Sequence, residues 1–269
     1  MNGMRLGFVG IGVMGGAILQ GVVNGRVLPP EQISIYDVDA EKKAQLCGQY
    51  GVANVSSVGE LIAQSDLVLF AVKPMVMGGL LAQVANELTG KAVVSIVAGW
   101  STAKIQGVLG DRARILCVMP NTPAIAGEGM SVLSADNTLT AEELELTKAL
   151  FCSFGKVEVL PERYFDIVTG ISGSGPAYVY QFIEALMEAG IYKGLPAKTA
   201  RTLAAQMVLG AAKLVLESDK HPAELRDAVC TPGGTTIEAV YELEQSGFTS
   251  SVMAAVIACA EKYSRMVGQ

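Results

Sequence analysis

The first 120 residues of this 269-residue chain alternate short apolar runs with segments of helical character. Such alternation is typical of a parallel β-sheet that is covered by helices on both faces. The expected strands are Arg5–Val9, Gln32–Asp37, Leu67–Val72, Ala92–Val97 and Arg114–Met119. The expected helices between them are Met14–Gly25, Ala40–Tyr50, Val58–Ser65, Met77–Thr89 and Thr102–Leu109. The sequence therefore predicts an α/β fold for this part of the chain.

The β signal ends at Pro161. Before it, Met130–Ala135 and Lys156–Leu160 are two more expected strands, separated by a helix that Thr140 opens with a capping-box pattern. Only helical segments follow, and no flexible linker precedes them. We therefore expect a Rossmann-type parallel-sheet domain at residues 1–161 and an all-α domain at residues 162–269.

Composition limits the partners of the chain. Charged residues make up only 17% of it and the net charge is −6, which disfavours a nucleic-acid partner. With so little charge, some apolar surface is expected inside a homo-oligomer. One helical face with small and apolar residues is a candidate for such burial: Ala200, Ala204, Met207, Ala211 and Leu214.

The sequence also favours a cytoplasmic protein. No apolar run is long enough to span a membrane, and glycines interrupt the apolar N-terminus, which disfavours a secretory leader. The five cysteines are scattered and form no CxxC pair, as expected for reduced, mostly buried thiols. The single histidine, His221, precedes Pro222 and is expected in a loop or at a helix start. No metal site is expected, because a zinc site built from several histidines is impossible.

The strongest local motif is the run Gly-Ile-Gly-Val-Met-Gly at residues 10–15, directly after the first expected strand. In this pattern the first glycine permits a tight turn, the second lets a pyrophosphate approach the backbone, and the third lets the helix pack against the strand. Asp37 ends the second expected strand, where an acid hydrogen-bonds the adenosine ribose and repels a 2′-phosphate. No arginine follows closely, and Asp39 is better placed to cap the next helix. We therefore expect a dinucleotide site that favours NAD(H) over NADP(H).

Further candidates lie at strand ends and at two glycine-rich stretches. Lys73 could reach a phosphate or be only solvated, and Asn121 lies between two prolines in a stiff loop suited to holding an amide against a nicotinamide or ribose. Ser172–Tyr178 and Thr231–Thr236 could expose backbone N–H groups to an anion, or simply separate helices.

Four motifs together resemble the pyrroline-5-carboxylate reductases: Val72-Lys-Pro, Met119-Pro-Asn-Thr-Pro, Thr169-Gly-Ile-Ser-Gly-Ser-Gly-Pro-Ala-Tyr and Cys230-Thr-Pro-Gly-Gly-Thr-Thr. They occur in order over essentially the whole chain, and the last is the most specific. The resemblance implies NAD(P)H-dependent reduction of L-1-pyrroline-5-carboxylate to L-proline, the last step of proline biosynthesis. It also implies that the helical domain interlocks two subunits into a homodimer, which in several members assembles into a ring of dimers.

The resemblance also assigns residues to the site. Those that would bind the cofactor are Val9, Gly10, Ile11, Gly12, Val13, Met14, Ala71, Val72, Lys73, Pro74, Ile96, Val97 and Ala98. Gly233, Gly234 and Thr235 would offer backbone amides to the substrate carboxylate. Thr236 would offer its hydroxyl to the ring nitrogen, as the catalytic residue, and Glu162 would lie near the same ligand. Many relatives carry a Ser or Thr for the 2′-phosphate where this chain has Asp37, which again favours NADH.

This chemistry needs no histidine, because a protonated cyclic imine is already a strong electrophile that the enzyme must chiefly align. Two other functions stay open. A 3-hydroxyacid dehydrogenase-like oxidoreductase needs a proton donor, generally a lysine on the first long helix of the second domain. The helix expected at Tyr178–Ala189 has no lysine, and the first is Lys193. A dinucleotide-binding sensor without turnover would leave the turn at residues 232–236 without a role.

Overall fold

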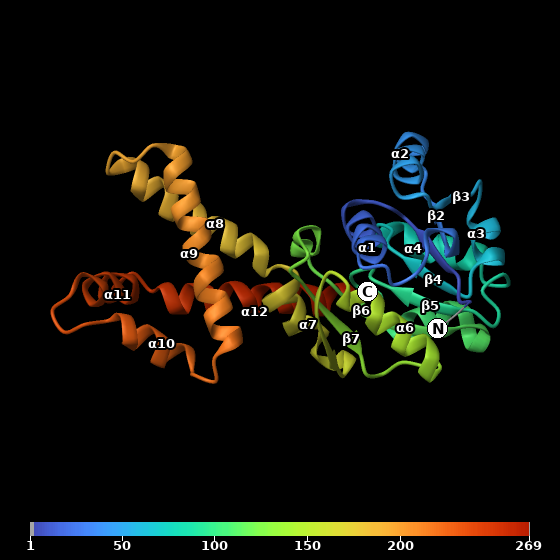
Figure 1. Cartoon of the computed structure of the whole chain (residues 1–269). Helices are drawn as coiled ribbons and strands as arrows, with labels where there is room; N and C mark the ends of the chain where they lie inside the picture. Colours follow the sequence, from blue (N-terminus) through green and yellow to red (C-terminus); the bar gives the residue numbers. More distant parts are fainter. Residues whose placement is uncertain (1–2, 269) are drawn as a thin grey trace. The chain divides into compact units, whose positions relative to one another are not determined.

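An eight-stranded sheet forms the centre of the N-terminal part in this computed structural model, which describes residues 3–268 (Figure 1). The order is β3-β2-β1-β4-β5-β6-β7-β8, and neighbours run parallel except for the antiparallel pair β6 and β7. The strands are β1 Leu6–Val9, β2 Ile33–Tyr36, β3 Ala53–Asn54, β4 Leu67–Phe70, β5 Ala92–Ser95, β6 Arg114–Met119, β7 Gly129–Ser134 and β8 Gly155–Leu160. The predicted parallel α/β fold is confirmed, and the two-residue β3 is the strand that the sequence pattern missed.

Helices cover both faces of this sheet because successive strand residues point to opposite sides. In β4, Leu67 and Leu69 belong to one core cluster with α1, α2 and α6, whereas Val68 and Phe70 belong to another with α3, α4 and α5. These helices are α1 Val13–Asn24, α2 Ala40–Tyr50, α3 Val58–Gln64, α4 Pro74–Gln83, α5 Thr102–Leu109 and α6 Ala141–Cys152. The predicted capping box at Thr140 is confirmed, because its hydroxyl accepts the Glu143 N–H and the Glu143 carboxylate accepts the Thr140 N–H.

The rest of the chain is helical, as predicted. Its helices are α7 Phe165–Val168, α8 Gly175–Tyr192, α9 Ala197–Glu217, α10 Pro222–Val229, α11 Thr235–Gln245 and α12 Phe248–Val267. His221 caps the start of α10, where its Nδ1 accepts the Ala223 N–H at 3.2 Å, so the predicted place of the histidine at a helix start is confirmed. The glycine-rich stretch after Thr169 is mostly helical: a π-helical turn at Thr169–Gly173 follows α7, and only Ser174 lies between this turn and α8.

The chain forms two compact units. Gly175–Ala258 form the helical unit, and the residues before Gly175 form the sheet unit together with the chain from Cys259 onward. The domain boundary at Pro161 stays a prediction. Within the helical unit, Ala200 and Ala204 of α9 are buried, but Met207 and Leu214 are 49% and 53% exposed. The predicted apolar face is therefore only half covered within one chain.

Three further observations concern membranes, metals and thiols. None of the helices within residues 3–268 combines the length and apolar character that a membrane span requires. In the same residues, no group of three His, Cys, Asp or Glu side chains is arranged to hold a metal ion. All five cysteines are free; Cys117 is buried, Cys152 is exposed and the others are half-buried. The sequence predicts mostly buried thiols, but four of the five are half-buried or exposed.

Candidate functional site

The glycine-rich loop between β1 and α1 has the geometry that its sequence predicts. Gly10 has a φ of +94°, and a Cβ atom there would lie 2.7 Å from the Ala71 carbonyl oxygen. A Cβ atom on Gly15 would collide with the Gly10 carbonyl oxygen, whereas one on Gly12 would meet nothing within 4 Å. Close packing therefore requires Gly10 and Gly15, while Gly12 leaves open space at the N-terminus of α1, where helix amides attract anions.

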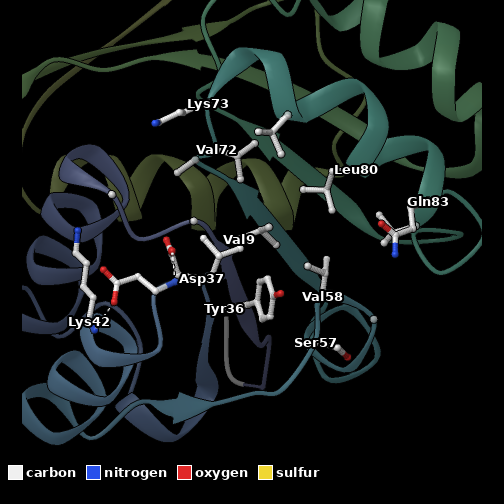
Figure 2. A pocket seen from close by; sticks show the side chains of 18 of the residues that line it. Val9, Tyr36, Asp37, Lys42, Ser57, Val58, Val72, Lys73, Leu80 and Gln83 are labelled. Atoms are coloured by element: carbon white, nitrogen blue, oxygen red, sulfur yellow. Dashed lines mark hydrogen bonds between the residues drawn. The ribbon is translucent and has the colours of Figure 1, made fainter.

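This loop borders a pocket of about 840 Å³ at the carboxyl ends of β1, β2 and β4 (Figure 2). The pocket lies at the topological switch point, where open α/β sheets bind their ligands. The predicted site residues that line it are Val9, Gly10, Gly12, Asp37, Ala71, Val72 and Lys73. Further lining residues are Tyr36, Val38, Asp39, Lys42, Ser57, Val58, Gly59, Val76, Leu80, Gln83, Val84 and Glu87. The helical spacing of Val76, Leu80 and Val84 was the sequence signal that could have found the wall formed by α4 and the residues after it.

Asp37 holds the glycine-rich loop in place as well as lining the pocket. Its Oδ2 accepts the Ile11 N–H at 2.7 Å and its Oδ1 accepts the Asp39 N–H at 3.0 Å. Each carboxylate oxygen can accept a second hydrogen bond, so a ribose hydroxyl can still be bound. Asp39 caps α2 by accepting the Lys42 N–H, as predicted. The acid after β2 thus fixes the loop that follows β1.

The composition of the pocket fits a nicotinamide dinucleotide. The open space at Gly12 and the uncapped start of α1 suit a pyrophosphate. Val58, Val76 and Leu80 supply apolar surface for a base, and the Asp37 carboxylate suits a ribose diol. Lys42, which the sequence analysis did not single out, also lines the pocket and supplies a cation there (Figure 2).

Other predicted cofactor residues are not part of the pocket lining: Ile11, Val13, Met14, Pro74, Ile96, Val97, Ala98 and Asn121. Pro74 is the first residue of α4, and Ile96–Ala98 follow the end of β5, so both groups lie at the same edge of the sheet as the pocket. Asn121 is buried; its Oδ1 accepts the Met130 N–H at 2.8 Å and its Nδ2 donates to the Ser172 carbonyl at 3.0 Å. These bonds fix the loop after β6, and a contact of Asn121 with the cofactor stays a prediction.

The glycine-rich turn at residues 231–236 lies in the helical unit and opens α11. Gly233 has a φ of +68°, and the Gly234 N–H donates to the Thr231 carbonyl at 3.0 Å. Gly234 is the N-cap of α11 and offers no capping side chain, which leaves first-turn amides available to a ligand. A small hollow here is lined by Gly233, Gly234, Thr235, Glu238, Ala239 and Glu242. Thr236 is half-buried in the first turn of α11.

Glu162 lies in the sheet unit, beside the start of α5. Its Oε1 accepts the Thr102 N–H at 2.8 Å, and its own N–H donates to Asp136 Oδ2 at 2.8 Å. Burial of the Cys117 thiol, together with the smaller effect of the nearby Glu162 charge, raises the pKa of that thiol to about 12. Glu162 therefore joins the segment before α7 to α5.

A parallel sheet with this glycine loop and an acid after β2 defines a dinucleotide-binding oxidoreductase class. Two family models match the chain. Residues 5–99 match the model described as NADP oxidoreductase coenzyme F420-dependent, and residues 162–266 match the model for pyrroline-5-carboxylate reductase dimerisation.

Full-length relatives give the particular family. The chain is 41% identical over 264 residues to the pyrroline-5-carboxylate reductase of Escherichia coli (strain K12), covering 97% of this chain and 98% of that protein. It is 41% identical over 266 residues to that of Synechocystis sp., covering 99% of each. Among solved structures, the Plasmodium falciparum pyrroline carboxylate reductase with NADP bound has a TM-score of 0.91, 33% identity and 99% coverage of both chains. The chain belongs to the pyrroline-5-carboxylate reductase family, as its motifs predicted.

Proposed function

We propose that this protein reduces L-1-pyrroline-5-carboxylate to L-proline with NADH as the preferred reductant. One observation carries the proposal: in a chain of this family, a dinucleotide-sized pocket holds a carboxylate, Asp37, at the ribose end of the glycine loop. The reduced nicotinamide, when bound, supplies the hydride. The chain itself must bind both molecules, align them and exclude water.

The cofactor contacts extend from this pocket. Residues 9–14 hold the pyrophosphate, and Ala71–Pro74 with Ile96–Ala98 hold the nicotinamide half. Asn121 orients the loop beside them and has a second amide hydrogen for the nicotinamide or ribose. Support comes from the pocket lining and from the position of both segments at one edge of the sheet.

The substrate contacts are proposed for the turn that opens α11. The amides of Gly233 and Thr235 bind the substrate carboxylate, because an uncapped helix start attracts an anion. The Gly234 N–H, which was predicted to share this role, already donates to the Thr231 carbonyl and closes the turn instead. The Thr236 hydroxyl bonds the ring nitrogen as the product amine forms. Glu162 is a candidate for a further contact with this ligand. None of these groups needs to titrate near neutral pH, so a single histidine that caps α10 is no obstacle.

The competing functions lack their key residues. α8, the first long helix of the helical part, contains no lysine, so the proton donor of a 3-hydroxyacid dehydrogenase is missing from it. A sensor without turnover needs no anion-binding turn at α11. The helical part belongs to the dimerisation family, and we propose a homodimer that can assemble further into a ring of dimers. Free thiols and biosynthetic relatives support a cytoplasmic location.

The loss of NADH absorbance tests this function. Turnover is expected with pyrroline-5-carboxylate and not with a 3-oxoacid or without substrate, and proline is expected as the product. Turnover of the 3-oxoacid instead would support the dehydrogenase. Binding of NADH without turnover of either substrate would support the sensor.

A further inference from the structure

The end of α12 lies against the loop that follows β5. From Cys259 onward, α12 belongs to the sheet unit, although the helix begins in the helical unit. Tyr263 is only 8% exposed and shares an apolar cluster with Val97, Ala98 and Trp100 of that loop. A long polar side chain that is buried at the end of the chain's last helix suggests a specific task for its hydroxyl group.

Close contacts join the helix end to this loop. Gly99 has a φ of +76°, and a Cβ atom there would be 3.5 Å from Cβ of Met266. Burial, followed by the charges of Cys117 and Glu162, raises the pKa of the Tyr263 phenol, and the backbone of Gly99 only partly offsets this rise, so the phenol stays neutral. One residue further along the helix, the Ser264 hydroxyl donates to Asp166 of α7 at 3.1 Å, which fixes the helix end itself in the sheet unit. The loop is thus held from the side of α12.

The other side of the loop reaches the cofactor pocket. The Trp100 indole N–H donates to the Pro74 carbonyl at 3.1 Å, and its carbonyl accepts the Cys117 thiol at 3.4 Å. Pro74 directly follows Val72 and Lys73, which line the pocket. A Cβ atom on Gly78 of α4 would be 3.1 Å from the Trp100 ring, so the ring also packs closely on α4. A series of contacts therefore runs from Tyr263, through the apolar cluster that it shares with Trp100, to the pocket wall.

We propose that Tyr263 is a positioning residue for the cofactor site: by fixing the loop at residues 96–101, it sets the place of Trp100 and of the start of α4. The inference rests on the proposed function only in taking NADH as the ligand of the pocket. Tyr263 does not line the pocket, so its effect on binding must pass through the loop. A pocket wall that is already ordered in the free protein raises affinity, because less conformational entropy is lost when the ligand binds.

The test compares Tyr263→Phe, Tyr263→Ala and the wild-type chain. We expect Tyr263→Phe to raise the dissociation constant for NADH about threefold, as loss of one buried polar group that faces the loop would. We expect Tyr263→Ala to raise it about tenfold. The chain's one tryptophan reports the loop directly, and its emission should shift in both variants without any ligand. The matched control is Arg265→Ala, because Arg265 is 62% exposed on the same helix and should leave affinity and emission unchanged.

A purely structural role predicts a different result. In that case the Tyr263 variants would melt at lower temperature but bind NADH like the wild type well below their melting temperature, and this would overturn the proposal. If Tyr263→Ala does not fold, Tyr263→Phe alone decides, since it removes a single oxygen. Binding is titrated through NADH fluorescence without substrate, so the result stands even if pyrroline-5-carboxylate is not turned over. Absence of NADH binding in the wild type would instead count against the proposed function.

Discussion

The sheet unit closes its core within one chain, whereas the helical unit does not. In the sheet unit, Phe8 and Phe70 are fully buried between the strands and helices. In the described residues 175–258, Ala200 and Ala204 are the buried hydrophobic residues, while Leu203 is 57% and Leu216 80% exposed. Apolar surface on this scale is typical of a subunit interface. The comparison teaches that the first unit is a self-sufficient binding domain, and that the second is completed by another copy, as its match to a dimerisation family indicates.

The largest expected effect comes from disrupting the interface between two copies of the helical unit. Leu203→Glu places a charge on the exposed apolar face of α9, and burying it in a dimer without a partner is costly. We expect the dimer dissociation constant to rise on the order of 100-fold. Light scattering coupled to size exclusion measures this, with Leu203→Met as the control that keeps an apolar side chain. A Leu203→Glu protein that stays dimeric at low concentration would show that this face is not the interface.

The sheet unit should respond to loss of an internal ion pair. Glu143 is nearly buried, and its Oε2 accepts the Arg114 Nε–H at 2.8 Å. Burial alone would raise the pKa of the Glu143 carboxyl, but hydrogen bonds from Arg114 and Thr140 outweigh it and lower that pKa. Glu143→Ala should lower the free energy of unfolding by about 2–3 kcal/mol, less than for a fully buried pair because Arg114 is partly exposed. Glu145→Ala, at an exposed ion pair with Lys148, should change it by less than about 0.5 kcal/mol.

The same carboxyl gives a pH dependence. A pKa that is lower in the folded state stabilises the fold above the unfolded value, and this contribution is lost as pH falls through the folded value. Wild-type stability should therefore fall more steeply than that of Glu143→Gln below about pH 4.5. Urea melts at several pH values measure both slopes. Parallel slopes would show that the pair does not couple to protonation.

The sequence predicted local elements better than the contacts between distant elements, for a physical reason. Strands such as Arg114–Met119 and the cap at Thr140 depend on local pattern, and the structure has them as predicted. Helical spacing marks one face of the segment that carries Leu80, Gln83 and Glu87, but that this face forms a pocket wall depends on how α4 lies against the sheet, which no local pattern gives. The same holds for Tyr263, whose neighbours Gly99, Cys117 and Glu162 lie more than 100 residues away along the chain. The π-helical turn after Thr169 was missed because its glycines read as a break.

A smaller effect separates substrate binding from cofactor binding. Thr236 lies in the helical unit, and Thr236→Ala should lower kcat/KM for pyrroline-5-carboxylate by about one to two orders of magnitude through loss of a polar contact to the ring nitrogen. The dissociation constant for NADH should not change, because the pocket lies in the sheet unit. Thr236→Ser keeps a hydroxyl and should retain most activity. Steady-state kinetics and NADH titration check both points, and unchanged kinetics in a folded Thr236→Ala protein would remove the residue from the site.

The smallest effect concerns which cofactor the sheet unit prefers. Asp37→Ser removes a negative charge that would face a 2′-phosphate, while Lys42 stays in the pocket as a cation able to pair with that phosphate. We expect the ratio of kcat/KM for NADPH to that for NADH to rise about tenfold. NADH should bind somewhat more weakly, since Ile11 and Asp39 lose their carboxylate acceptor. Adding Lys42→Ala to Asp37→Ser should remove most of the gain with NADPH, because the phosphate then loses its cation. An unchanged ratio in Asp37→Ser would mean that cofactor selectivity arises elsewhere in the pocket. The KM for pyrroline-5-carboxylate is the control, because it should stay the same if the helical unit is unaffected.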